Sequence, residues 1–346
     1  MRLTEFGKMG LAIPPILFGT TSLGNLYVAL SDEMQRQIVS EWFRQVEQPF
    51  VVDSAGKYGA GLALENLGRH LKSLSIPPER VIISNKLAWR RTPLTTPEPT
   101  FEPGVWVDLQ HDAVQDISYD GILRCHEDGC ELLGDYRPRL LSVHDPDEYL
   151  AAAIDSKDRA ARWQDILEAY RALQQLRDAG EVIGVGVGSK DWTVIRDLYE
   201  QQPLDWVMIA NSFTVHSHPP ELLAFIDQLR RDGVAVVNSA VFNGGFLVGG
   251  NHYNYRLVDG ETEEGQRLLT WRKAFHQLCH DHQVDPALAC VAFGQSPPGI
   301  VAVALSSTKP SRVTSNLELV DGSAPPEFWD AAKAQRLIDP DYAHLP

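Results

Sequence analysis

Cysteine is scarce in this sequence. The chain of 346 residues contains four cysteines, Cys125, Cys130, Cys279 and Cys290. They are too few and too widely separated for a disulfide framework, and their spacing does not match paired zinc ligands. We therefore expect reduced cysteines that pack in the core or on helix faces, and we predict no metal site.

Long apolar runs and basic clusters are also missing. No apolar stretch is long enough to cross a bilayer, and the N-terminal segment MRLTEFGKMG lacks the apolar core of a signal peptide. Lys and Arg number 31 against 46 Asp and Glu, a formal net charge of -15. This charge argues against a surface that neutralises nucleic-acid phosphates or anionic lipid. We expect a cytoplasmic protein that binds neither nucleic acid nor membrane, and its oligomeric state stays open.

What the chain does contain is typical of a folded globular protein. Hydrophobic residues make up 44% of it and charged residues 22%, without the high charge and low hydrophobicity that mark disorder. Its length allows two domains, but α/β barrels routinely run about 250 residues or more as one domain. No linker or low-complexity tract divides it, so we predict one domain over residues 1–346.

Short β-rich runs alternate with longer segments of helical period. Eight such runs occur, at 16–19, 50–53, 81–86, 140–144, 182–188, 206–210, 234–238 and 300–305. The segments between them place apolar residues at helical spacing and several end on Gly; they are 31–46, 62–74, 119–134, 163–180, 191–201, 219–233, a stretch around 271–282, and 309–320. Strands that are apolar on both faces and separated by helices predict a parallel sheet covered by helices.

Eight βα units most economically close into a (β/α)8 TIM barrel. An open doubly wound sheet is the alternative, and it requires a glycine-rich turn after the first strand to bind phosphate. The turn in that place is FGTTSLGNLY, which does not fit. GVGVG at 184–188 is glycine-rich, but it lies late in the chain and inside a predicted strand. The barrel is therefore the preferred fold class.

Four ionisable residues fall at the predicted C-terminal ends of barrel strands, where such barrels carry their chemistry. Asp53 ends the second strand, Lys86 the third and His144 the fourth, and Tyr58 follows Asp53 in the loop. Taken singly, each has an ordinary interpretation as a turn, rim or structural residue. Their joint placement at one barrel mouth predicts a site.

The four residue types suit a proton transfer coupled to a hydride transfer. A tyrosine has an unperturbed pKa of about 10 and needs a nearby cation before it can act as a base near neutral pH. Lys86 can supply that charge, and Asp53 can keep the lysine protonated. His144 can hydrogen-bond the substrate oxygen while Tyr58 exchanges the proton.

The sequence at this point resembles the aldo-keto reductase family over nearly the whole chain. The resemblance rests on FGTTSLGNLY, DSAGKYG with its Asp-x4-Tyr spacing, SNK and SVHDPD, in that order on successive strands. It implies the (β/α)8 barrel preceded by a short N-terminal β-hairpin. It also implies that Asp53, Tyr58, Lys86 and His144 are the catalytic tetrad, and that a nicotinamide cofactor binds without a Rossmann domain.

Two further segments are similar to one branch of that family, the sugar dehydrogenases that oxidise aldoses at C1, such as D-threo-aldose, L-fucose and L-galactose dehydrogenases. VFNGGFLVGG at 241–250, followed by YNY, is similar to their loop after the seventh strand. SYDGILRCHEDGCELLG at 118–134 is similar to the helix before their HDPD. The branch implies an NAD(P)-dependent oxidation of an aldose to its lactone.

The resemblance also implies a set of cofactor-binding residues: Gly19, Thr20, Thr21, Asp53, Ser189, Ser239, Phe242, Asn243, Gly244, Ser307, Thr308, Lys309, Arg312 and Asn316. Departures from the family pattern occur at Ala63-Leu64, at Gly188, at Ser306, which replaces a basic residue, and at Ser315. Lys309 and Arg312 can hold the 2'-phosphate of NADP, or can be solvated charges on a helix. The cofactor is therefore NAD or NADP, and Ser306 favours NAD.

Substrate contacts are expected from Tyr58 and His144 and from the long segment between Leu87 and Ile117. That segment holds Trp89 and Trp106, and long loops in compact domains are usually functional. The two indoles can stack on a sugar, or can simply hold the loop against the barrel.

Three other functions remain open. They are an NADPH-dependent aldehyde or ketone reductase, a regulatory protein of the same fold that binds the cofactor without turnover, and a metal-dependent isomerase or hydrolase that uses His144 and Asp145. The last lacks further residues at ligand spacing.

Overall fold

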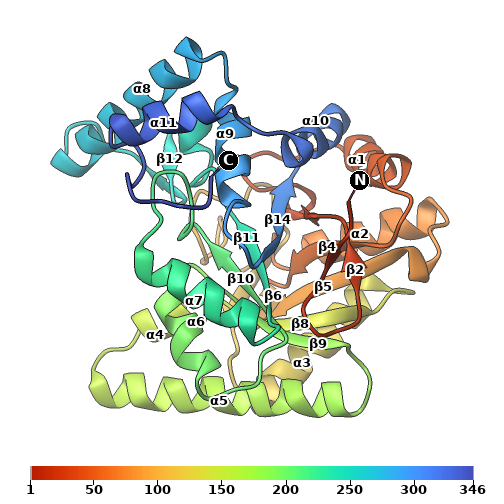
Figure 1. Ribbon diagram of the computed structural model, residues 1–346. Helices are drawn as coiled ribbons and strands as arrows, with labels where there is room; N and C mark the ends of the chain where they lie inside the picture. Colours follow the sequence, from red (N-terminus) through yellow and green to blue (C-terminus); the bar gives the residue numbers. More distant parts are fainter. Residues whose placement is uncertain (1, 346) are drawn as a thin grey trace.

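The computed structural model describes residues 2–345, and it confirms the predicted (β/α)8 barrel. Eight parallel strands close on themselves in chain order, so that the last pairs with the first. Each predicted β-rich run overlaps one of these strands (Figure 1), which are β3 (Ile16–Gly19), β4 (Phe50–Ala55), β5 (Val81–Leu87), β8 (Pro138–His144), β9 (Gly184–Ser189), β10 (Trp206–Ala210), β11 (Ala235–Ser239) and β14 (Ile300–Ser306).

Helices surround the barrel at the predicted segments. These are α1 (Asp32–Gln45), α2 (Leu62–Ser73), α3 (Tyr119–Leu133), α5 (Ser156–Asp178), α6 (Trp192–Tyr199), α7 (Pro220–Arg231), α8 (Glu263–Asp281) and α10 (Pro310–Asp321). Side-chain caps fix several of their starts: Ser31 accepts from the N–H of Met34 before α1, and Asp155 does the same for α5. The Asp155 cap starts α5 at Ser156, earlier than the predicted segment at 163.

Three helices have no counterpart among the predicted segments. They are α4 (Pro146–Ala151), α9 (Pro286–Gly294) and α11 (Pro326–Ala334). Each carries Pro in its first turn, where the missing N–H costs no hydrogen bond. Figure 1 shows α11 beside α8, close to the C-terminus. Short 3-10 helices occur at η1 (Thr21–Gly24), η2 (Pro78–Arg80) and η3 (Phe246–Val248).

The expected N-terminal β-hairpin is present. It covers the end of the barrel at which the strands begin, here called the lower end. Its strands are β1 (Thr4–Glu5) and β2 (Ala12–Ile13), paired antiparallel. Phe6 between them is fully buried, and its ring centroid lies 6.5 Å from that of Trp206 inside the barrel. The N–H of Lys8 donates to the carbonyl of Gly233 at 3.0 Å, which fixes the hairpin below β11.

The GVGVG segment is part of β9, and its glycines make room inside the barrel. A Cβ on Gly186 would lie 2.5 Å from the indole of Trp206, and one on Gly188 would lie 2.9 Å from Cδ of Lys86. Val185 and Val187 point the other way, into the core between barrel and helices, and both are fully buried. The alternation therefore serves packing and leaves space for the Lys86 side chain.

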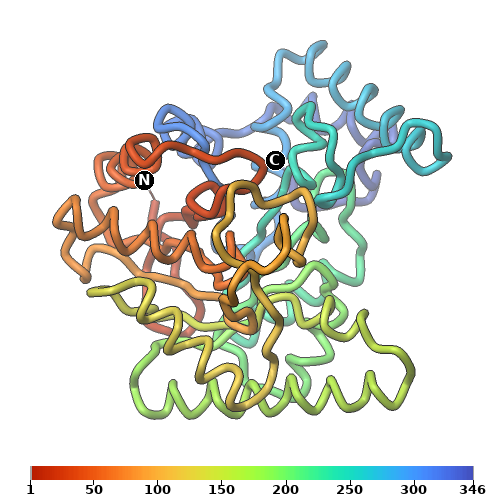
Figure 2. The backbone as a smooth tube through the Cα atoms, turned by 180° about the vertical axis from the view of Figure 1, so that it is seen from behind, coloured from red at the N-terminus to blue at the C-terminus, as the bar shows by residue number. Residues whose placement is uncertain are grey.

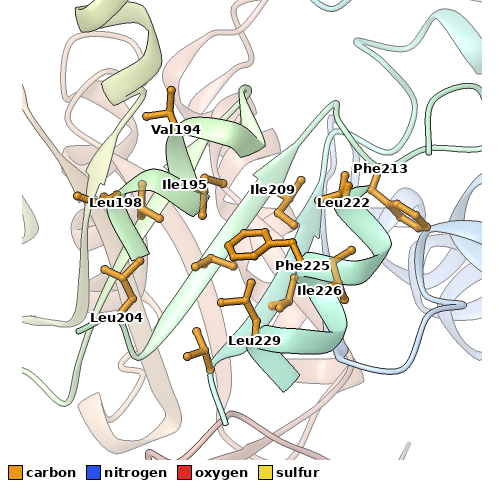
Figure 3. Packing of buried hydrophobic residues seen from close by; sticks show 14 of the residues in the cluster. Val194, Ile195, Leu198, Leu204, Ile209, Phe213, Leu222, Phe225, Ile226 and Leu229 are labelled. Atoms are coloured by element: carbon orange, nitrogen blue, oxygen red, sulfur yellow. The ribbon is translucent and has the colours of Figure 1, made fainter. Parts of the chain in front are cut away.

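The largest part of the core lies between the strands and the helices. Figure 3 shows part of this core, with Val194, Ile195 and Leu198 of α6 and Phe225 and Leu229 of α7 in one buried cluster. Complete burial of each such side chain stabilises the fold by about 1.5–3 kcal/mol. The apolar faces that predicted these helices thus hold them on the sheet.

The segment between Leu87 and Ile117 contains a β-hairpin that was not predicted. β6 (Trp89–Pro93) pairs antiparallel with β7 (His111–Gln115). The connecting loop, 94–110, lies over the barrel end and appears in orange near the centre of Figure 2. The N–H of Tyr27 donates to the carbonyl of Val105 at 2.8 Å, which ties this loop to the loop after β3. A second small hairpin, β12 (His252–Tyr253) with β13 (Arg256–Leu257), follows β11.

Within residues 2–345, no helix combines the length and apolarity that a membrane span requires. The four cysteines are free, and Cys130 alone among them is partly accessible. The described part of the chain holds no group of three or more His, Cys, Asp and Glu residues arranged to bind a metal ion.

Candidate active site

The register of the barrel brings the four predicted catalytic residues to one end. Asp53 is in β4, Lys86 is near the end of β5, and His144 ends β8. Lys86 pairs with Ala55 on one side and with Ser142 on the other. Because all the strands are parallel, their C-terminal ends share one mouth.

The distances show that these side chains form one cluster. Nζ of Lys86 lies 2.5 Å from Oδ2 of Asp53 and 4.7 Å from the centroid of the Tyr58 ring. The rings of Tyr58 and His144 meet edge to face, with centroids 5.6 Å apart and an angle of 84° between their planes. Tyr58 and His144 therefore lie side by side at the barrel mouth.

Asp53 and Lys86 form an ion pair that solvent does not reach. Their exposed fractions are 3% and 1%. Ser84 donates a further hydrogen bond to Oδ1 of Asp53 at 3.4 Å. Burial raises the pKa of Asp53 above its usual value, although the lysine charge opposes that rise. Such a pair is stable only while both partners are present, because either charge alone pays the full desolvation cost.

The pKa of Tyr58 lies well above its ordinary value. Burial is the main cause, and the negative charge of Asp53 adds to it. The sequence analysis expected Lys86 to lower this pKa, and the structure shows the opposite net direction. The main reason is the burial of the phenol, and Asp53, 2.5 Å from the Lys86 ammonium, adds a negative charge that compensates the lysine. Tyr58 is therefore held as a phenol, which can donate a proton.

His144 is held as a neutral imidazole. Burial and the nearby Lys86 lower its pKa well below the usual value, and these effects outweigh the opposing charge of Asp145. Its Nδ1 is buried without a hydrogen-bond partner in residues 2–345. Its Nε2 lies 3.6 Å from Oδ2 of Asp145. A neutral ring with an unpaired nitrogen can hydrogen-bond a substrate oxygen without adding charge.

A cavity of about 300 Å³ opens above this cluster, and all four residues line it. Seven of the expected cofactor-binding residues also line it: Gly19, Thr21, Asp53, Ser189, Ser239, Phe242 and Gly244. The remaining wall is mainly apolar and includes Leu26, Val105 and Met208. The cavity is thus continuous from the tetrad to the loop after β11.

The two tryptophans expected to contact substrate lie in different positions. Trp106 lines the cavity, its ring centroid is 5.8 Å from that of Tyr58, and its Nε1 donates to Oε2 of Glu102 at 2.7 Å. Trp89 lies outside the lining, because β6 turns it toward Phe101, 5.8 Å away. For Trp89 this position favours the second of the two expected roles, that of holding the loop against the barrel.

Sequence reasoning missed an ion-pair network beside the tetrad. It contains two lysines and three carboxylates, Lys57, Lys190, Glu102, Asp145 and Glu148. Lys57 precedes Tyr58 within DSAGKYG, and Asp145 follows His144 within HDPD. The sequence contains both motifs, but the contacts join residues far apart in the chain, Lys57 with Asp145 and Glu148, and the 94–110 loop adds Glu102.

The family model for the aldo/keto reductase family matches residues 15–335, most of the chain. This chain belongs to the aldo/keto reductase family. Among curated relatives, it is 27% identical over 345 residues to pyridoxal 4-dehydrogenase from Microbacterium luteolum, covering 96% of each chain. It is also 27% identical over 341 residues to D-threo-aldose 1-dehydrogenase from Pseudomonas sp., covering 95% of this chain and 96% of the relative.

Solved structures agree on the fold. An aldo-keto reductase from Bacillus halodurans superposes with a TM-score of 0.70 at 18% identity, covering 99% of this chain and 98% of that one. The match to the family model confirms the predicted family membership. Membership implies an oxidoreductase that uses a nicotinamide cofactor.

Two groups at the reductase cavity fit a nicotinamide cofactor: Gly245 lines the cavity, and Asn211 lies next to the lining residue Ala210 but outside the lining itself. Asn211 follows the end of β10, is 5% exposed, and has both side-chain amide atoms buried without a partner in the described residues. Such an orphaned amide suits a carboxamide partner. Asn211 was not predicted as a site residue, although it directly follows the predicted strand WVMIA and so lies at the end of that strand. A Cβ on Gly245 would meet no atom within 4 Å, so the backbone there is open to a ligand.

The other expected cofactor residues lie outside the cavity lining. They are Thr20, Asn243, Ser307, Thr308, Lys309, Arg312 and Asn316. Thr20 donates to the carbonyl of Asp53 at 3.0 Å, and Asn316 donates to Oγ of Ser307 at 3.2 Å, so these two support the site from behind. Lys309 and Arg312 are exposed at the start of α10, and neither pairs with a carboxylate of the described chain.

Proposed function

We propose that this aldo/keto reductase oxidises a cyclic hemiacetal, namely an aldose at C1, to the lactone. The observation that carries the proposal is the clustering of Tyr58, His144 and the Asp53–Lys86 pair on one cavity large enough for a sugar ring. The similarity to D-threo-aldose 1-dehydrogenase supports the substrate class.

The residues of the chain provide the proton transfer and the positioning. His144, neutral and with an unpaired ring nitrogen, holds the C1 oxygen. Tyr58 accepts the C1 hydroxyl proton in oxidation and returns it in reduction. The mainly apolar wall excludes water from these groups, which strengthens both hydrogen bonds.

The raised pKa of Tyr58 gives the two directions opposite pH dependence. Oxidation needs the phenolate, whose fraction grows tenfold per pH unit below the pKa, so the rate of oxidation rises toward alkaline pH. Reduction needs the phenol, which is already dominant at neutral pH. We therefore propose faster reduction near pH 7 and faster oxidation above it.

A bound nicotinamide cofactor supplies the hydride acceptor. We propose that Ser189 and Asn211 hold its carboxamide and that the backbone around Gly244 and Gly245 holds its pyrophosphate. Lys309 and Arg312 are available for a 2'-phosphate, whereas Ser306 is neutral and receives a hydrogen bond from Thr21 at 2.9 Å. NAD and NADP thus both remain candidates, and Ser306 favours NAD.

Pyridoxal is a second candidate substrate. The similarity to pyridoxal 4-dehydrogenase extends over the whole chain, and pyridoxal also closes into a cyclic hemiacetal. Tyr27, Trp106 and Tyr255 line the cavity and can face an aromatic ring. An NADPH-dependent aldehyde or ketone reductase of the same fold is the remaining alternative.

The deciding experiment measures NAD and NADP reduction with L-fucose, D-arabinose, L-galactose, L-xylose and pyridoxal. We expect one of the hemiacetals to be oxidised, and deuterium placed at its reacting carbon to appear in the reduced cofactor. Reduction of simple aldehydes with NADPH, without oxidation of any hemiacetal, would instead identify a general carbonyl reductase. Cofactor binding without any steady-state turnover would identify a regulatory protein.

A further inference from the structure

The ion-pair network beside the tetrad is built around Lys57. This side chain is 2% exposed, and its ammonium lies 2.8 Å from Oε1 of Glu102, 3.0 Å from Oδ2 of Asp145 and 2.7 Å from Oε2 of Glu148. An ammonium has three N–H donors, so every donor of Lys57 has a carboxylate partner. Lys57 has none left for a ligand.

Lys190 completes the network on the side of β9. It donates to Oε1 of Glu148 and lies 3.6 Å from Oδ2 of Asp145 and 3.8 Å from Oε1 of Glu102. Its side chain is 28% exposed, and its ammonium lies 5.5 Å from the centroid of the Tyr255 ring. Lys190 keeps N–H donors for a neutral oxygen, but three carboxylates already surround its charge.

These charged groups face the ligand. Lys57, Glu102, Asp145 and Lys190 all line the cavity, and the other charged residues of its lining are the mutually paired Asp53 and Lys86. The network has two positive and three negative side chains, so its net charge is one negative unit. Among the residues that line the cavity in the described chain, no cation is left unpaired.

This arrangement is unsuited to a carboxylate on the substrate. A site that binds a carboxylate presents an uncompensated Arg or Lys, whereas a second anion here would meet Glu102 and Asp145 at low dielectric. Neutral hydroxyl groups meet no such barrier. Tyr27 and Tyr255 line the same cavity, and their hydroxyls form no hydrogen bond with any described residue, so these hydroxyls are available to substrate hydroxyls.

We propose that the network of Lys57, Lys190, Glu102, Asp145 and Glu148 selects uncharged polyhydroxy substrates and excludes those that carry a carboxylate. For a cyclic sugar this inference rests on the proposed function. Its physical basis applies to any carbonyl or alcohol that reaches the tetrad: every cation of the cavity wall is already paired, and the network behind that wall carries one excess negative charge because of Glu148. Glu102 is the member whose charge can be removed with least disturbance, because Lys57 retains two other carboxylates.

The test compares substrates that differ in a single charge. The first pair is the hexose with a primary hydroxyl at C6 that is oxidised with the highest kcat/KM, and the uronic acid that carries a carboxylate at C6 instead. Both are assayed for oxidation. The second pair is 4-(hydroxymethyl)benzaldehyde and 4-carboxybenzaldehyde, assayed for reduction. For the wild-type protein we expect kcat/KM to favour the neutral member by at least about tenfold, mainly through KM.

Two substitutions assign the preference to the network. Glu102→Gln removes one negative charge and should reduce the ratio at least about threefold toward the acid, since the Gln oxygen still accepts from Lys57. Glu98→Gln, an exposed position on the same 94–110 loop, is the matched control and should leave the ratio and the activity unchanged. Thermal unfolding of both variants verifies that the loop remains folded.

The outcomes separate this inference from the proposed function. If the aldehyde pair shows the preference but no hemiacetal is oxidised, the charge selection holds and the proposed function fails. Equal kcat/KM for both members, or a ratio that Glu102→Gln leaves unchanged, overturns the inference. If neither pair is turned over, calorimetry with cofactor present measures the Kd of 1,4-benzenedimethanol and of 4-(hydroxymethyl)benzoate. A Kd at least about tenfold lower for the neutral diol supports the inference, and equal Kd values overturn it.

Discussion

The two ends of the barrel share one strand geometry and differ in the side chains they enclose. At the lower end, the hairpin residue Phe6 and the indole of Trp206 fill the interior, and a Gly at 186 leaves space for that indole. At the upper end, where the strands end and the cavity opens, the interior holds the buried pair of Asp53 and Lys86. The lower end gains stability from apolar burial, whereas the upper end carries charges whose desolvation costs stability. The barrel separates these tasks along its axis.

Within the upper end, the two buried lysines are compensated differently. Lys86 has one carboxylate partner and lies over the ring of Tyr58. Lys57 has three carboxylate partners, and they raise its pKa far above the usual value despite its burial. Only Lys86 is therefore placed to respond to a proton transfer at Tyr58. If the two ends act independently, a substitution at one end should leave the properties of the other unchanged.

Removing Lys86 should have the largest effect, because this residue serves both stability and turnover. Lys86→Met leaves Asp53 buried without a counter-charge, which costs about 3–5 kcal/mol of unfolding free energy. The negative charge next to Tyr58 is then uncompensated and raises the pKa of the phenol further, so the rise in oxidation rate should move to higher pH. Denaturant unfolding and a pH-rate profile measure the two effects.

The double variant Asp53→Asn with Lys86→Met is the matched control. It removes both charges and should recover a large part of the lost stability but not the turnover. If the double variant is as unstable as the single one, the loss comes from packing rather than from an unpaired charge. An unchanged pH profile in Lys86→Met would remove this lysine from the proton transfer.

Trp206→Ala addresses the lower end and should affect stability alone. The indole is fully buried inside the barrel, and truncation of such a residue costs about 3–5 kcal/mol. Trp163→Ala, at a partly exposed position on α5, should cost less. Below its melting temperature the Trp206 variant should keep its kcat. Loss of turnover in the folded variant would show that the two ends are coupled.

The difference between the ends also explains what could be predicted from sequence. The eight strands and the convergence of Asp53, Lys86 and His144 follow from local patterns, because parallel strands that end together place their last residues at one mouth. The same rule would have placed Asn211, which follows the run at 206–210. These predictions need no knowledge of long-range pairing.

Features that depend on contacts between distant parts of the chain could not be predicted in this way. Trp89 lies behind the cavity because β6 pairs with β7, a register set by residues 111–115. Lys57 meets Asp145 and Glu148 across separations of 88 and 91 residues. The raised pKa of Tyr58 is likewise a property of burial and summed charge, and neither can be read from a motif.

Tyr58→Phe addresses the upper end without removing a charge. The hydroxyl of Tyr58 forms no hydrogen bond to a described residue. Its removal should therefore change the free energy of unfolding only slightly. Turnover should fall by at least about 100-fold, the lower range for a lost general acid or base, while cofactor binding persists. Tyr119→Phe on α3, outside the cavity lining, is the control. Near-normal kcat in Tyr58→Phe would remove the proton-transfer role from this residue.

Asp147→Asn should change the free energy of unfolding less than Lys86→Met or Trp206→Ala does. It tests whether a desolvated charge at the upper end lowers the stability of the fold. Burial, helped by the charge of Asp145, raises the pKa of Asp147 to about 6. A carboxyl whose folded pKa exceeds its unfolded value of about 3.9 stabilises the fold fully only below that value, and the stability is lost as the pH rises through 6. The Asn side chain carries no charge and can still accept from the N–H of Asp191, as Asp147 does at 3.2 Å.

The Asp147 variant should therefore be more stable than wild type at pH 7.5, by about 1–2 kcal/mol. This is less than a full two-unit shift would give, because solvent reaches part of the side chain. The advantage should shrink between pH 6 and pH 4, where wild-type Asp147 takes up its proton. Denaturant unfolding at several pH values measures it, with the exposed Asp178→Asn as control. A gain that does not depend on pH would mean that packing, not the desolvated charge, sets stability at the upper end.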